Sequence, residues 1–217
     1  MTNELVHRIR PATGGADGAL VLLHGRGADE HDLGSLLEVL DPERRLVGIT
    51  PRGPLSLPPG GAHWYVVRSI GFPDGGTFHA TFARLSAWLD ALPERTGVPI
   101  ERTVIGGFSQ GAVMSYALGL GSGRPSPAGI IALSGFLPTV AGFSLDLESR
   151  GGLPVAIGHG TLDPVIGIEF GHEARDRLSA AGLDVLYRET PMSHTIDPDF
   201  IPELRDWLAA RIPVAAP

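Results

Sequence analysis

Short, nearly continuous apolar segments alternate along this sequence with longer segments in which apolar residues recur every three or four positions. The short segments are bounded by Gly or Pro and have the pattern of strands buried on both faces: 20–23, 46–49, 103–106, 129–133 and 154–157. The longer ones have the pattern of amphipathic helices: 30–40, 77–96, 110–120, 167–181 and 198–211. This alternation predicts an α/β fold with a mostly parallel, doubly wound sheet.

One domain is expected over residues 1–217, because no repeat and no Pro/Gly linker separates two halves that could each hold a core. The one long irregular stretch is Gly53–Gly76, which nevertheless carries Trp64, Tyr65 and Phe72. Long loops inside a compact domain are often binding segments. Two interpretations stay open, a wall of a binding groove and a hairpin that covers the core.

Composition excludes several kinds of chemistry. The chain has no Cys, so it can form no disulfide, thiolate nucleophile, cysteine zinc site or iron–sulfur cluster. Its 17 basic residues are all Arg, and the absence of Lys rules out Schiff-base chemistry, a pyridoxal-phosphate anchor and a phosphate-loop lysine. We expect no cofactor and no metal.

The charge pattern also limits the partners. A formal net charge of −7 with scattered Arg argues against nucleic acid and anionic membrane surfaces as partners. Residues 1–5 show no signal-peptide pattern, and no apolar stretch approaches the roughly 18 residues that a membrane-spanning helix needs. We therefore expect a cytoplasmic protein without membrane insertion that acts on a small molecule.

Gly107–Gly111 matches G-x-S-x-G, the sharp turn between a strand and a helix that exposes a serine hydroxyl. The pentapeptide alone is a weak signal, but here a buried strand is predicted before it and a helix after it. Both glycines then have a steric reason, because strand and helix backbones approach closely at such a turn. Ser109 is the candidate nucleophile.

A serine nucleophile needs a base, and three histidines follow it in the chain. His172 lies within a predicted helix, and His159 sits at a strand end close to the best candidate acid, so a structural role is expected for both. His194 lies in a loop between a strand-like segment, 183–188, and the predicted helix 198–211. We assign His194 as the base, since catalytic groups collect in such loops.

Asp163 and Asp146 are the two candidates for the acid that orients the base. Each follows a predicted strand, and Asp163 is favoured because its loop is short, contains Gly and is held by Pro164. Taken alone, Asp163 is equally typical of a helix N-cap. The order of serine, acid and histidine at successive strand ends supports the catalytic interpretation.

Two backbone N–H groups would stabilise a developing oxyanion. One is expected from Gln110, directly after the nucleophile at the start of a helix, and the other from Arg26 in the loop after strand 20–23. His24 in that loop is interpreted as a buried, hydrogen-bonded residue rather than a metal ligand, even with His31 nearby.

These residues together resemble the phospholipase/carboxylesterase family of α/β-hydrolases, which includes acyl-protein thioesterase-like enzymes. The resemblance covers essentially the whole chain and rests on Leu22–Glu30, Gly107–Gly111, Gly160–Val165 and the His194 loop. It implies an α/β-hydrolase domain without a helical cap that hydrolyses carboxylic esters without a metal, with the triad and the oxyanion donors named above. Bacterial members are often homodimers, so a homodimer is one expected state.

The resemblance also implies that Trp64 lines the substrate groove, and we add Tyr65, Phe72, Val165 and Met192 to the expected substrate-binding residues. The chain departs from the family at two positions. Ser193 precedes the histidine where relatives commonly have Gly, and Arg26 stands where relatives often have a small or apolar residue.

Three functions follow, in decreasing order of expectation. The first is a serine carboxylesterase for short-to-medium acyl chains, with a peak expected at roughly C2 to C8. The second is a thioesterase or lysophospholipase with the same triad. The third is a non-catalytic binding protein of the same fold, which the presence of all three triad residues disfavours.

Overall fold

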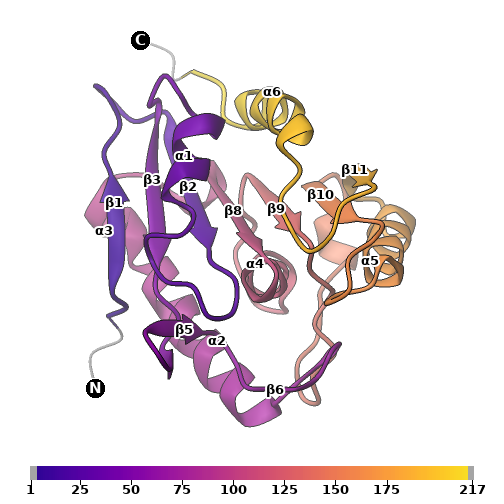
Figure 1. Cartoon of the computed structure of the whole chain (residues 1–217). Coiled ribbons are helices and arrows are strands. Elements are labelled where there is room, and N and C mark those ends of the chain that lie inside the picture. Colours follow the sequence, from indigo (N-terminus) through magenta and orange to yellow (C-terminus); the bar gives the residue numbers. More distant parts are fainter. Residues whose placement is uncertain (1–3, 215–217) are drawn as a thin grey trace.

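A seven-stranded sheet runs through the molecule in this computed structural model, which describes residues 4–214 (Figure 1). The ends of the predicted domain, 1–3 and 215–217, lie outside the described residues. The strands follow the order β1 (His7–Arg10), β3 (Leu46–Pro51), β2 (Gly18–Leu23), β8 (Thr103–Phe108), β9 (Gly129–Leu133), β10 (Pro154–Gly160) and β11 (Asp184–Thr190). All neighbours are parallel except β1, which pairs antiparallel with β3.

Helices cover both faces of the sheet because the apolar strands present side chains to both. On β2, Leu20 and Leu22 pack with the helices of one face, whereas Val21 and Leu23 pack with those of the other. The first face carries α1 (Gly34–Leu40) and α6 (Ile201–Arg211), and the second carries α2 (Gly75–Asp90), α3 (Leu92–Thr96), α4 (Gln110–Leu120) and α5 (Ile168–Ala180). The predicted mostly parallel, doubly wound sheet is confirmed.

The structure corrects two predicted helices and adds one strand to the seven-stranded sheet. The helix expected over 77–96 is two helices, since α2 ends at Asp90 and α3 starts at Leu92 with a proline in its first turn. The helix expected over 30–40 begins only at Gly34. Strand β1 was not predicted, because its four residues are half-buried or exposed and show no apolar run.

Two short hairpins occupy most of the stretch 53–76. The first pairs β4 (Leu55–Leu57) with β5 (Gly61–His63), and the second pairs β6 (Val67–Ser69) with β7 (Phe72–Pro73). Between them, the side chains of Trp64 and Tyr65 are buried in the core. The stretch thus forms hairpins whose intervening residues cover the core, and it also supplies Tyr65 and residues of the second hairpin to the wall of a cavity described below.

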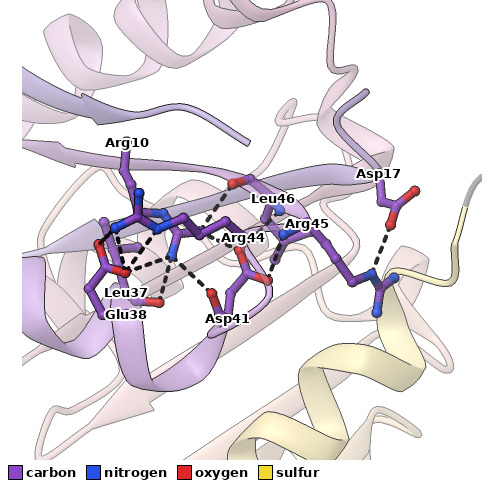
Figure 2. Close-up of polar contacts among 8 residues, drawn as sticks. All are labelled: Arg10, Asp17, Leu37, Glu38, Asp41, Arg44, Arg45 and Leu46. Carbon is purple, nitrogen blue, oxygen red and sulfur yellow. Dashed lines mark hydrogen bonds and ion pairs between the residues drawn. The ribbon is translucent and has the colours of Figure 1, made fainter. Parts of the chain in front are cut away.

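A buried ion-pair network fixes the added edge strand to the sheet, as Figure 2 shows. Arg10 on β1 pairs with Asp41 and donates to the carbonyl of Leu46 on β3. Asp41 in turn accepts the backbone N–H groups of Arg45 and Leu46. Arg45 extends the network to Asp17 at an N–O distance of 2.8 Å. Leu46 begins β3 and Asp17 directly precedes β2, so these contacts lie at the amino ends of those strands.

The described residues contain no helix long and apolar enough to cross a membrane. Within residues 4–214, the connection from β9 to β10 holds only a single 3-10 turn, at Glu148–Arg150. No helical cap is therefore inserted in that connection.

Candidate active site

Ser109 stands at the turn between β8, the central strand, and α4. Its backbone has φ 55° and ψ −120°, a strained combination for a residue with a side chain. The turn is tight enough that a β-carbon on Gly111 would lie 1.9 Å from the carbonyl oxygen of Leu23, and one on Gly107 would lie 2.4 Å from the carbonyl carbon of Gly111. The two glycines thus allow the turn, and the turn presents the hydroxyl at the carboxyl edge of the sheet.

His194 and Asp163 reach Ser109 from loops after neighbouring strands of the same edge. His194 follows β11, and its Nε2 lies 2.9 Å from Oγ of Ser109. Asp163 follows β10, and its Oδ2 lies 2.6 Å from Nδ1 of His194. The three side chains form one hydrogen-bonded series, which is the arrangement a serine nucleophile needs.

The Asp163 carboxylate is held in its ionised form by its hydrogen bonds. Burial alone would raise its pKa, but His194 and the N–H groups of Ile166 and Val165 outweigh burial and keep the pKa below the usual range. Helix α5 begins only after Gly167, and no side chain caps it. Asp163 is therefore not the N-cap that its sequence context also allowed.

The alternative partners considered in the sequence are engaged elsewhere. The carboxylate of Asp146 accepts hydrogen bonds from the N–H and hydroxyl of Ser149. Nε2 of His172 lies 2.7 Å from Oε2 of Glu189. His159 is buried with Nε2 at 2.8 Å from the carbonyl of Ile166, where it donates. Burial lowers the pKa of His159, which keeps it neutral beside the triad.

Arg26 and Gln110 both line the cavity that Ser109 opens into. Across residues 4–214, no protein acceptor takes the backbone N–H of either residue. The positive end of α4 starts at Gln110 and favours negative charge there. The site can therefore offer two free donors to an oxyanion.

The Gln110 side chain has a role that the sequence did not indicate. Its Oε1 accepts the N–H of Trp64 at 3.0 Å, and its Nε2 donates to the carbonyl of Tyr65 at 2.9 Å. The amide thereby fastens the segment between the two hairpins to the nucleophile turn. Nothing in the local sequence could reveal this, because the partners are about 45 positions apart.

A small cavity of about 70 Å³ adjoins Ser109. Of the predicted substrate-binding residues, Tyr65 and Val165 line it. The other lining residues with apolar side chains were not predicted: Val67, Ile70, Phe136 and Ile166.

Three predicted substrate-binding residues lie elsewhere. The Trp64 side chain is 0% exposed, and its indole N–H donates to the carbonyl of His24, so Trp64 supports the cavity from behind and does not line it. Phe72 is 63% exposed on the second hairpin, outside the cavity lining. Met192 is half-buried, and its carbonyl accepts the N–H of Leu162. The prediction was wrong for Trp64 because aromatic residues in a Pro/Gly-rich stretch do not reveal which of them turns inward.

A second, wider groove of about 420 Å³ is lined in part by His194. Apolar side chains of α1, the ring of Phe108 and the 194–201 segment form it. Phe108 also packs on His194 with ring centroids 4.8 Å apart. The base thus lines the open groove, whereas the serine to which it is hydrogen-bonded lines the small cavity.

The histidine expected to be structural in the 24–27 loop is buried and fully bonded. Nδ1 of His24 lies 2.7 Å from the carbonyl of Gly25, and Nε2 accepts the N–H of Gly53. His31 instead joins Asp29 and Glu30 in a surface group whose ligand atoms lie within 4.8 Å of one another. Arg52 pairs with both of these carboxylates, and His24 takes no part in the group.

Comparisons with known proteins agree with this geometry. A family model described as Phospholipase/Carboxylesterase matches residues 6–212. Acyl-protein thioesterase 1 of Neurospora crassa is 30% identical, over 95% of this chain and 91% of the relative. Among solved structures, esterase PE8 superposes with a TM-score of 0.80 at 27% identity, covering 95% of this chain and 99% of that one. The Bacillus cereus carboxylesterase superposes at 0.82 with 22% identity, covering 95% and 94%. The chain has the α/β-hydrolase fold.

Proposed function

Because the chain belongs to the phospholipase/carboxylesterase family, we propose that it is a serine carboxylesterase that hydrolyses short-to-medium acyl esters through an acyl-enzyme on Ser109. The observation that carries this proposal is the series of hydrogen bonds from Ser109 through His194 to Asp163. A serine hydroxyl becomes a useful nucleophile only when a positioned base takes its proton.

The reaction proceeds in two halves. Oγ of Ser109 attacks the ester carbonyl carbon while Nε2 of His194 takes the hydroxyl proton, and Asp163 stabilises the imidazolium that forms. The N–H groups of Arg26 and Gln110 bind the oxyanion. His194 then returns the proton to the leaving alcohol, the ester C–O bond breaks, and water attacks the acyl-enzyme by the same route.

The small cavity and the open groove suit the two halves of an ester. The leaving oxygen must lie next to Nε2 of His194 to receive its proton, so the alcohol extends toward the open groove that His194 and Phe108 line. The acyl chain then enters the cavity that Ser109, Arg26 and Gln110 line. Short acyl chains fit best, because the cavity is far below the roughly 300–1,000 Å³ of sites that enclose larger ligands.

Thioester hydrolysis is the second candidate, supported by the acyl-protein thioesterase 1 relative. The same three residues would serve a thiol leaving group. Parallel series of esters and thioesters with graded acyl length would separate the two activities. We expect kcat/KM to peak between roughly C2 and C8 in both series.

Active-site labelling tests the proposal directly. A fluorophosphonate probe is expected to label Ser109, and Ser109→Ala to lose both labelling and ester turnover. His194→Ala should cost nearly as much, because groups that act as a unit are not additive. Ser122→Ala is the matched control, since Ser122 is exposed and its hydroxyl hydrogen-bonds to Ser144. Labelling at another residue would overturn the proposal, and so would turnover by the Ser109→Ala variant.

Assembly as a homodimer stays a prediction. Sedimentation velocity at several protein concentrations would test it.

A further inference from the structure

The arginines of this chain are nearly all engaged within the fold. Over residues 4–214, which include every arginine, fifteen of the seventeen side chains make a hydrogen bond or an ion pair with a carboxylate or a backbone carbonyl. The exceptions in that range are Arg8 and Arg26. Arg8 lies on the edge strand β1 and lines a different groove, whereas Arg26 lines the cavity beside Ser109.

Arg26 is the one charged residue among those that line this cavity. Three carboxylates follow it in the loop. Asp29 and Glu30 are held by Arg52, and Asp32 lines the wider groove; within residues 4–214, none of the three forms an ion pair with Arg26. Arg26 is an exposed residue, and an incoming ligand can reach it without displacing a protein partner. A fixed positive charge therefore borders an otherwise uncharged acyl cavity.

Arg26 also contributes the backbone N–H assigned above to the oxyanion hole. An acyl chain whose carbonyl oxygen sits on that N–H starts beside the same residue that carries the guanidinium. An anionic group a few bonds along the chain then lies within its reach. A guanidinium binds a carboxylate through two parallel N–H donors, which adds direction to the charge attraction.

Resting on the proposed function, we propose that Arg26 selects substrates whose acyl half ends in a carboxylate, so that half-esters of short dicarboxylic acids are preferred over neutral esters of equal length. The protein's net charge of −7 repels anions in general. The preference is thus local to the cavity and depends on a single side chain.

The test compares two ethyl esters of matched chain length, ethyl hydrogen glutarate and ethyl valerate, with the released acid measured by chromatography. The readout is the ratio of their kcat/KM values. Arg26→Gln keeps the backbone N–H and should lower the ratio about five-fold, the size expected for a partly exposed charge pair. Arg26→Lys should retain most of the ratio, and Arg26→Glu should lower it further.

Arg8→Gln is the matched control, because it removes the other unengaged guanidinium from a site outside the cavity. Its ratio should equal that of the wild type. The wild-type ratio should also decline from low to high salt, whereas that of Arg26→Gln should not.

Three outcomes would overturn the inference. If neutral esters are hydrolysed and the ratio is the same in the wild type and Arg26→Gln, the proposed function stands and the role of Arg26 fails. If Arg26→Gln instead lowers kcat/KM for the valerate ester of glycolic acid, Arg26 binds a carboxylate on the alcohol half of the substrate. If the wild type hydrolyses no ester, the proposed function fails and this inference fails with it.

Discussion

Replacement of Asp163 by Asn isolates the electrostatic contribution of the acid from its packing. The asparagine Oδ1 can still accept the N–H groups of Val165 and Ile166, at 2.8 and 2.9 Å in the native protein. Its amide nitrogen, however, replaces the Oδ2 atom that lies 2.6 Å from Nδ1 of His194. The amide donates where the carboxylate accepted, so His194 takes the tautomer with its proton on Nε2 and cannot accept the proton of Ser109.

The expected loss in kcat is on the order of 10⁴, the effect of this change in a well-studied serine protease, which corresponds to about 5.5 kcal/mol of activation free energy. The free energy of unfolding should change by less than about 2 kcal/mol, because the three hydrogen bonds of this side chain remain and lose only the contribution of the carboxylate charge. Steady-state hydrolysis of p-nitrophenyl butyrate gives the first quantity, and urea unfolding gives the second.

Asp146→Asn is the matched control and should leave kcat unchanged, since Asp146 contacts Ser149 and not the base. A variant with Asn at position 163 that is folded yet keeps more than about a tenth of wild-type kcat would refute the reasoning. A larger loss of kcat in Asp146→Asn than in Asp163→Asn would assign the role of the acid to Asp146.

Three further predictions concern stability and use urea unfolding. Gly111→Ala should destabilise the protein by about 3 kcal/mol or more, because the new β-carbon would overlap the carbonyl oxygen of Leu23, and a well-folded variant would contradict the geometry of the turn. Trp64→Ala should cost about 3–5 kcal/mol, since the side chain is fully buried and donates to His24, and an unchanged unfolding midpoint would contradict its burial. Burial lowers the pKa of both His24 and His159, so below about pH 6.5 the unfolded chain binds more protons than the native one, and stability should fall as the pH drops from 7.5 to 5.5. This decrease in stability should be smaller in His159→Gln. An equal decrease in that variant would show that groups other than His159 cause the pH dependence.

The sequence by itself determined the features that local patterns encode. Continuous apolar runs mark strands buried on both faces, and the strands β2, β3, β8, β9 and β10 were expected at or near their observed places. The glycines around Ser109 were interpretable for a similar reason, because a turn that excludes a β-carbon constrains the residue type at that position. Chain order then limited the partners of Ser109 to a few residues at later strand ends.

The tertiary structure alone decided which of these residues meet and which face inward. His194 rather than His159 faces Ser109, although His159 lies at the carboxyl end of β10 and His194 follows β11, its neighbour. Strand β1 exists because β3 offers an edge and Arg10 finds a buried carboxylate, neither of which lies in its own four residues. Trp64 turns inward because its indole N–H donates to the carbonyl of His24 and its backbone N–H donates to the side-chain amide of Gln110. Burial and pairing depend on atoms supplied by distant parts of the chain, so a local pattern can state a residue's chemistry but not its neighbours.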